Sequence, residues 1–280
     1  MTDKYAVIGN PVEHSKSPEI HAAFARQTRQ DISYERVLAP IDTEDGFSKT
    51  VDRLIAQGYK GANVTVPFKY SAFLKTSKRD TPRAEFARAI NTLSFCNGEI
   101  SGDNTDGVGL VTDISKNLGF DIKGKKVLLV GAGGAAFGVL GPLREQSPMQ
   151  LIISNRTFAK AEEAAKILAP LAKLRADDTE VLAKCFEELN GCSFDLVINA
   201  TSSSLNDELP AIPDSVFAPG ALAYDMMYGR ETPFMKFART HGAQVADGLG
   251  MLVEQAAEAF FIWRGVRPDT APVIAQLRSA

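Results

Sequence analysis

Short apolar, β-branched segments alternate with helical patterns of apolar residues along the first part of the chain. The apolar segments predict strands at residues 5–8, 34–38 and 62–66, and the segments between them predict helices at residues 18–27 and 44–57. An alternation of this kind is typical of βα units that form a mostly parallel sheet. The pattern therefore predicts an α/β fold for the first part of the chain.

A second series of the same kind begins near residue 124 and predicts another α/β unit. Strands are expected at residues 125–130, 150–154, 195–198 and 222–224, with helices at residues 135–145 and 159–168. Apolar residues at helical spacing then run from Leu249 to Trp263, and Arg264 and Gly265 supply a basic last turn and a C-cap glycine. The pattern leaves open whether this last helix completes the second unit or returns to the first.

The composition narrows the class of protein. A length of 280 residues corresponds to about two domains. With 31 basic and 34 acidic residues, the formal net charge of -3 argues against nucleic acid or an anionic membrane surface as the main partner. The cysteines form no CxxC pair and the histidines no HExxH motif, so we expect no bound metal and a reducing compartment. Because no signal-peptide pattern starts the sequence, we expect a globular cytoplasmic protein.

The predicted strand at residues 125–130 leads directly into a glycine-rich turn. Gly131, Gly133 and Ala136 have the GxGxxA spacing, and a helical pattern follows. In this motif the first glycine permits a tight turn, the second lets the backbone approach a pyrophosphate, and the small third residue keeps helix and strand close. The helix N-terminus adds free N–H groups and the positive end of its dipole. The turn therefore predicts a dinucleotide site.

The tip of the next predicted strand favours NADP over NAD. An NAD site usually carries an Asp or Glu about 20 residues further on, bonded to the ribose 2′-hydroxyl. Here the strand is followed by Asn155, Arg156 and Thr157, with no acid. The planar fork of Arg156 suits a 2′-phosphate, and Lys160 adds a further charge. The plainer interpretation of Arg156 is an exposed loop arginine without a ligand.

Three polar clusters in the first half are not explained by core packing. They are Ser15 with Ser17, the segment from Asn63 to Lys69, and Asn91 and Thr92 with residues 102–107. Ser17 is expected to cap the helix that Pro18 begins, and a helix N-terminus beside two hydroxyls suits a small carboxylate. Lys69 follows the carboxyl end of a predicted parallel strand, where open α/β sheets bind ligands. For the third cluster, a structural turn is the plainer alternative to a ligand site.

These clusters and the glycine turn occur in the order typical of one family. The chain resembles the shikimate dehydrogenases, in particular the bacterial NADP-dependent enzymes of aromatic amino-acid biosynthesis, over almost its whole length. The resemblance is carried by GNP at residues 9–11, HSKSP at 14–18, NVTVPFK at 63–69, NT at 91–92, NTD at 104–106, GAGGA at 131–135, NRT at 155–157, NATS at 199–202, YDMMY at 224–228 and DGLGM at 247–251, followed by Gln255. One of these motifs alone would be weak evidence, but the ordered set is specific.

The resemblance implies a fold and an activity. Residues 1–105 and 248–280 would form a substrate-binding domain with a mainly parallel sheet, and residues 106–247 a Rossmann-type NADP-binding domain. The C-terminal helices would return to the first domain. The implied activity is the reversible, NADPH-dependent reduction of the small molecule 3-dehydroshikimate to shikimate, by a monomer or homodimer.

The resemblance also assigns roles to individual residues. Lys69 would be the acid/base and Asp106 its partner. The substrate carboxylate would be bound by Ser15 and Ser17 with Tyr228 nearby, and the ring hydroxyls by Thr65, Asn91, Asp106 and Gln255. NADP would be held by Gly131, Ala132, Gly133, Gly134, Ala135, Asn155, Arg156, Thr157, Lys160, Met226 and Gly248.

Several positions depart from the family pattern, among them Arg88 and Lys160, and three alternative functions accompany this interpretation. Arg88 stands where a glycine is common, and Lys160 stands where an arginine is often found. The alternatives are a quinate/shikimate dehydrogenase with relaxed cofactor use, a catalytically silent binding protein on the same scaffold, and another two-domain NADP enzyme such as a folate-linked dehydrogenase. The presence of both Lys69 and Asp106 argues against a silent protein.

Overall fold

The chain divides into two compact units in a computed structural model that describes residues 2–43, 45–79, 81–174 and 178–279. The first unit comprises Met1–Gly109 and Leu252–Ala280, and the second comprises Leu110–Met251. Both divisions fall inside helices, namely α5 (Asp106–Thr112) and α9 (Leu249–Arg264). The junctions expected from the sequence, 105/106 and 247/248, lie just before these points. Each unit is described below by itself.

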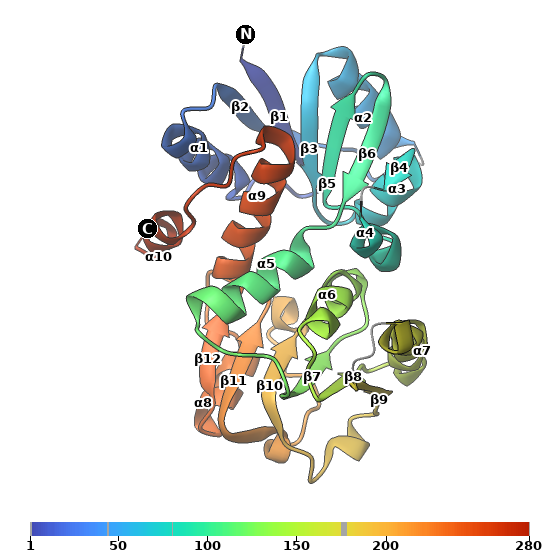
Figure 1. Cartoon of the computed structure of the whole chain (residues 1–280), viewed down its shortest axis with the longest axis vertical. Helices are drawn as coiled ribbons and strands as arrows, with labels where there is room; N and C mark the ends of the chain where they lie inside the picture. The colour runs from blue at the N-terminus through green and yellow to red at the C-terminus, as the bar shows by residue number, and fades with distance from the viewer. Residues whose placement is uncertain (1, 44, 80, 175–177, 280) are drawn as a thin grey trace. The chain divides into compact units, whose positions relative to one another are not determined.

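The described residues of the first unit contain a six-stranded sheet in the order β2-β1-β3-β5-β6-β4 (Figure 1). Its strands are β1 (Asp3–Gly9), β2 (Ile32–Leu38), β3 (Tyr59–Val64), β4 (Lys78–Arg79), β5 (Thr92–Cys96) and β6 (Glu99–Asp103). β1 pairs in parallel with β2 and β3, whereas β5 is antiparallel to both β3 and β6. The antiparallel pair arises because Asn97 and Gly98 both have positive φ, which forms a two-residue hairpin turn.

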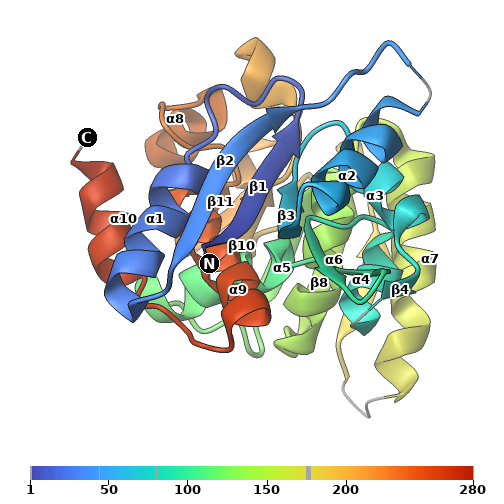
Figure 2. The same ribbon diagram turned by 90° about the horizontal axis from the view of Figure 1, so that it is seen from above.

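Helices cover both faces of this sheet (Figure 2). They are α1 (Ser17–Thr28), α2 (Gly46–Ala56), α3 (Lys69–Lys75), α4 (Pro82–Ala87), α9 and α10 (Ala271–Arg278). One buried core joins the sheet to α2, α3 and α4, and another joins α1 to α9 and α10. In the second core the rings of Phe24 and Phe260 meet edge to face, 5.8 Å apart. The expected return of the C-terminal helices to the first unit is confirmed.

The described residues of the second unit contain a wholly parallel sheet in the order β12-β11-β10-β7-β8-β9. Its strands are β7 (Lys126–Val130), β8 (Gln150–Ser154), β9 (Glu180–Ala183), β10 (Phe194–Asn199), β11 (Phe217–Asp225) and β12 (Gln244–Asp247), and its helices include α6 (Gly134–Glu145), α7 (Phe158–Leu174) and α8 (Pro233–Thr240). This is the doubly wound order of dinucleotide-binding domains, with the switch point between β7 and β10. The predicted Rossmann-type α/β fold is confirmed.

Local details correct the expectations at two helix starts. Lys16, not Ser17, occupies the N-cap position of α1, and its side chain makes no capping bond. Ser17 is instead the first helical residue, and its N–H donates to the Ser15 hydroxyl over 3.3 Å. In the helix expected at residues 44–57, Glu44 lies outside the described residues and α2 begins at Gly46. Within the part of the chain that the structure describes, no helix is long and apolar enough to cross a membrane.

Candidate active site

Lys69 and Asp106 form an ion pair in the first unit. Lys69 begins α3 directly after the turn that follows β3, and Asp106 begins α5. The Lys69 Nζ lies 2.5 Å from the Asp106 Oδ2, with 24% of the lysine side chain and 10% of the aspartate side chain exposed. A carboxylate in the first turn of a helix is favoured by the helix dipole. The pair is therefore shielded enough from water to hold a defined geometry, yet the ammonium stays accessible.

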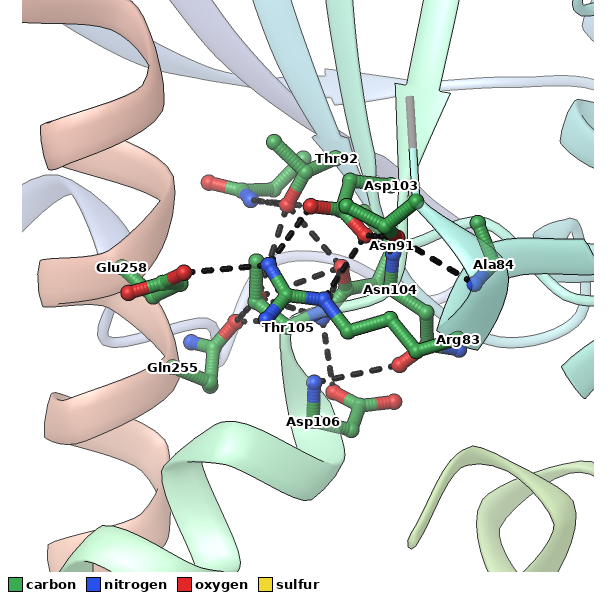
Figure 3. A network of polar contacts seen from close by, with 12 residues as sticks. Arg83, Ala84, Asn91, Thr92, Asp103, Asn104, Thr105, Asp106, Gln255 and Glu258 are labelled. Carbon is green, nitrogen blue, oxygen red and sulfur yellow. Dashed lines mark hydrogen bonds and ion pairs between the residues drawn. The ribbon is translucent and has the colours of Figure 1, made fainter. Parts of the chain in front are cut away.

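The Asn91 side chain fixes the second oxygen of Asp106 (Figure 3). Its amide nitrogen donates to Asp106 Oδ1 over 2.7 Å and to the Thr105 hydroxyl over 2.9 Å. Its amide oxygen accepts from the Thr105 N–H and from the Thr92 hydroxyl, each over 2.9 Å. Gln255 on α9 approaches the same cluster, with its Oε1 at 3.4 Å from the Asn91 nitrogen. Four predicted residues, Lys69, Asn91, Asp106 and Gln255, are thus brought together.

A chain of polar contacts extends from Asn91 toward the start of α1. Asn63 donates to the Thr92 hydroxyl over 3.2 Å and accepts from the Tyr34 hydroxyl over 2.7 Å. Burial raises the pKa of Tyr34 well above its ordinary value, and a hydrogen bond with Ser17 opposes the rise. The Ser15 and Ser17 hydroxyls lie 3.2 Å apart. The structure therefore connects the two serines to the lysine pair through Tyr34 and Asn63.

Tyr34 belongs to this network of polar contacts but was not expected from the sequence. It lies in β2 beside His21 of α1, and the two rings stack 4.2 Å apart at an angle of 7°. The sequence pattern that could have indicated it is that Tyr34, which carries a hydroxyl, lies two residues after Ile32 and so on the same face of the strand. Thr65, by contrast, lies where it was expected, half-buried at the carboxyl end of β3, and its N–H donates to the Ile8 carbonyl over 2.9 Å.

In the second unit, the turn after β7 requires glycine and leaves open space. Gly131 has a φ of +123°, and a Cβ there would lie 3.0 Å from the Ala200 backbone in the neighbouring turn. At Gly133 and Gly134 a Cβ would meet nothing within 4 Å, and no side chain caps α6. Ala132 is buried, whereas Ala135 is exposed in the first turn of the helix. The uncapped N–H groups beside open space fit the pyrophosphate of a dinucleotide.

The segment after β8 is solvent-accessible and carries two cationic side chains. Arg156, Thr157 and Lys160 are exposed. The Asn155 side chain donates to the Thr157 carbonyl over 2.9 Å, which holds the segment in a turn before α7. The Lys160 N–H also donates to that carbonyl, over 3.1 Å. The tip of β8 therefore presents two exposed positive charges to solvent.

Met226, Tyr228 and Gly248 also belong to the second unit. Met226 follows β11, and its N–H donates to the Asn199 carbonyl over 3.0 Å at the end of β10. The Gly248 N–H donates to the Met227 carbonyl over 2.9 Å, and a Cβ at Gly248 would collide with the Met226 carbonyl group. Tyr228 is half-buried, and burial raises the pKa of its hydroxyl. The backbone at Gly248 thus packs on the Met226 turn at a distance that only glycine allows.

Three family models match the chain in sequence order. The shikimate dehydrogenase substrate binding domain matches residues 7–93, the shikimate / quinate 5-dehydrogenase model matches residues 113–206, and the shikimate 5′-dehydrogenase C-terminal domain matches residues 248–278. The shikimate dehydrogenase (NADP+) of Methylobacillus flagellatus is 60% identical over 279 residues, which cover 99% of this chain and 100% of the relative. The matches thus extend over both units.

Solved structures agree with these sequence matches. The crystal structure of an enzyme from Pseudomonas putida is 46% identical with a TM-score of 0.91, covering 99% of this chain and 98% of that one. Shikimate 5-dehydrogenase from Thermus thermophilus, solved with NADP(H) and shikimate, is 30% identical with a TM-score of 0.84 and covers 99% of both chains. With the family models, the 60% identical relative and these folds in agreement, the chain belongs to the shikimate dehydrogenase family.

Proposed function

We propose that this protein catalyses the reversible, NADPH-dependent reduction of 3-dehydroshikimate to shikimate in the shikimate pathway. The observation that carries the proposal is the Lys69–Asp106 pair, held by Asn91 in a chain that belongs to the family. A positioned ammonium can stabilise the negative oxygen that forms when a ketone is reduced and can give it a proton. The first unit is accordingly proposed as the substrate domain and the second as the NADP domain.

The second unit offers the groups that NADP requires. The proposed binding residues are Gly131, Ala132, Gly133, Gly134 and Ala135 at the start of α6, Asn155, Arg156, Thr157 and Lys160 after β8, and Met226 with Gly248. Bound NADPH supplies the hydride. The N–H groups at the start of α6 hold a diphosphate without a protein side chain, and the exposed guanidinium of Arg156 can pair with the 2′-phosphate through two hydrogen bonds.

The first unit offers groups for a small polyhydroxy acid. Ser15 and Ser17, beside the N-terminus of α1, are proposed to hold the carboxylate, and Tyr228 to bind the same substrate. Thr65, Asn91, Asp106 and Gln255 are proposed to bind the ring hydroxyls. Amide and carboxylate groups that are already fixed by neighbours, as Asn91 and Asp106 are, bind hydroxyls with little further loss of side-chain entropy.

The proton movement follows from the geometry of the pair. In the reducing direction the hydride adds to the ketone carbon, and the electrons of the C=O π bond move to the oxygen. The Lys69 ammonium stabilises this oxygen and gives it a proton, so the product is an alcohol. In the oxidising direction the Lys69 nitrogen would take the hydroxyl proton as the carbon gives up its hydride. Asp106 keeps the Lys69 nitrogen in place in both directions.

Two further properties stay predictions. The described cysteines Cys96, Cys185 and Cys192 are free thiols, which is typical of a protein from a reducing compartment, and we propose a cytoplasmic location. We also propose that the protein acts as a monomer or homodimer.

The test is the appearance of the absorbance of the reduced cofactor, NADPH or NADH, with shikimate or quinate as substrate, each with NADP+ or NAD+. We expect efficient turnover of shikimate with NADP+ and much slower turnover in the other three combinations. Comparable rates with NAD+, or efficient quinate oxidation, would instead establish a quinate/shikimate dehydrogenase with relaxed cofactor use. Binding of shikimate and NADP+ without turnover would identify a silent protein on the same scaffold.

A further inference from the structure

Arg83 joins two acidic side chains from different elements of the first unit (Figure 3). Its guanidinium, on α4, forms a fork on the Asp103 carboxylate at the end of β6, with Nε to Oδ1 at 2.9 Å and Nη2 to Oδ2 at 2.6 Å. The same Nη2 lies 3.0 Å from Oε1 of Glu258 on α9. Arg83 is therefore bonded to both the strand before Asp106 and the helix that carries Gln255.

The three charged groups are largely removed from water. The exposed fraction of the side chain is 4% for Asp103, 12% for Glu258 and 21% for Arg83. Burial disfavours the charged guanidinium, but Asp103 and Glu258 outweigh this effect and raise the pKa of Arg83. A buried carboxylate needs such a partner, because leaving it unpaired is strongly unfavourable. Arg83 is thus the cationic partner that holds the Asp103 carboxylate in place.

Asp103 is linked to Asp106 by two consecutive hydrogen bonds. The Asp103 Oδ1 accepts from the Asn104 N–H over 2.7 Å, and the Asn104 Oδ1 accepts from the Asp106 N–H over 3.1 Å. Asn104 is fully buried, and its amide nitrogen donates to the Ala89 carbonyl over 2.8 Å. The backbone position of Asp106 is therefore set by Asn104, and that of Asn104 by the Asp103 carboxylate.

A second route leads from Asp103 to the other partner of the ion pair. The Asn91 N–H donates to the Asp103 carbonyl over 3.1 Å, and Asn91 in turn fixes Asp106 Oδ1. The neighbouring Ile90 N–H donates to the Lys69 carbonyl over 2.9 Å. Both members of the Lys69–Asp106 pair are thus positioned by the backbone segments that meet at Asp103.

We propose that Arg83 is a positioning residue for the reaction: by holding Asp103 it sets, through Asn104 and Asn91, where Asp106 places the Lys69 nitrogen. The inference rests on the proposed function, since it concerns the same pair. A displacement of about 1 Å at reacting groups can lower the rate by about 10²-fold, so a residue outside the pair can control turnover. If Arg83 only stabilised the fold, its replacement would lower the stability of the protein. Any effect on kcat would then be the same with or without Lys69.

The variant Arg83→Lys tests this inference, because it keeps the positive charge and removes the planar fork. Shikimate oxidation with NADP+ is first measured for the wild-type protein, and absence of turnover would overturn the proposed function together with this inference. With turnover established, we expect Arg83→Lys to lower kcat by about 10-fold or more, with a much smaller change in KM. An unchanged kcat would overturn the inference alone.

A double-mutant cycle distinguishes an effect of Arg83 on the position of Lys69 from an effect on the stability of the fold. Residues that act as one unit are non-additive, so Arg83→Lys should change kcat little in a Lys69→Ala background. An equal fractional loss of kcat in both backgrounds would overturn the inference. Asp103→Asn, which keeps the side-chain shape, should show the same dependence on Lys69 and replaces Arg83→Lys if that variant does not fold. Arg267→Lys is the matched control, because Arg267 bonds Glu258 from the exposed side, and its kcat should match that of the wild type.

Discussion

Lys69 Nζ and Asp106 Oδ2 lie 2.5 Å apart, although 36 residues separate them in the chain. The intervening segment includes three strands and the short helix α4. Lys69 is the first residue of α3 and Asp106 is the first residue of α5. Each side chain therefore projects from the N-terminus of a helix. Short charge-assisted hydrogen bonds of this kind are stronger than neutral ones. The pair therefore needs little rearrangement to meet a reacting oxygen.

The first prediction concerns Lys69. Because the ammonium is the only group of the pair that can give a proton, Lys69→Ala should lower kcat by about 10²- to 10⁴-fold. Shikimate should still bind, since the hydroxyls of Ser15 and Ser17 remain. Steady-state rates and calorimetric titration with shikimate measure the two effects. Lys75→Ala is the control on the same helix, where Lys75 pairs with Asp52, and a near-normal rate for Lys69→Ala would refute the catalytic role.

The second prediction concerns cofactor choice. Hydrogen bonds to a charged group contribute about 1.5 to 3 kcal/mol, so Arg156→Ala should raise the KM for NADP+ by about 10- to 100-fold. The KM for NAD+, which lacks the 2′-phosphate, should change much less. The comparison of the two cofactors is the measurement, and Lys166→Ala, an exposed cation on α7, is the matched control. Equal increases for both cofactors would show that Arg156 does not recognise the 2′-phosphate.

The elements around the glycine turn were predictable because several signals agree there. The apolar strand, the GxGxxA turn and the following helix were each expected within a few residues of β7 and α6, and β8 was expected at residues 150–154, as observed. Strong periodicity and turn chemistry act locally, so they can be read without knowledge of the rest of the molecule. The order of strands around the switch point follows from the same rules.

Contacts between distant segments could not be predicted in this way. Arg83 and Glu258 meet only because α9 returns to the first unit, and 174 intervening positions give no local signal of it. The hairpin at Asn97 and Gly98 was missed for a different reason. The Asn-Gly pair is a strong hairpin signal, but the flanking strands β5 and β6 are only five residues long and carry weak alternation.

The third prediction concerns Arg88, which ends α4 with a φ of +46°. This left-handed conformation costs a non-glycine residue about 1 to 2 kcal/mol. Replacement by glycine removes this cost, but the greater flexibility of glycine in the unfolded chain offsets part of the gain. Arg88→Gly should therefore raise the free energy of unfolding by about 1 kcal/mol, measured by urea denaturation. Arg88→Ala removes the same exposed side chain but keeps the unfavourable φ, so it should give no gain. Equal stability of the two variants would contradict the conformational explanation.

The last prediction concerns His21, which is fully buried against Tyr34 and Phe260. Burial lowers the pKa of His21 to about 3, and the neighbouring Asn63 side chain opposes the shift. In the unfolded chain the pKa returns to about 6.5, so between these values the unfolded state binds more protons than the folded state. The free energy of unfolding should therefore rise with pH across this window, and the stability should be lost as the pH falls below about 6.5.

A pH series of urea denaturation curves tests this consequence. One pKa unit corresponds to about 1.4 kcal/mol, so His21 should cost the folded state about 2 kcal/mol on going from about pH 7.5 to about pH 5. His21→Gln cannot take up the proton in either state, and its stability should fall less than that of the wild type over the same interval. His14→Gln, at an exposed position, should follow the wild type. If His21→Gln and the wild type lose stability equally, the folded protein accommodates a charged His21, which its apolar surroundings should not allow.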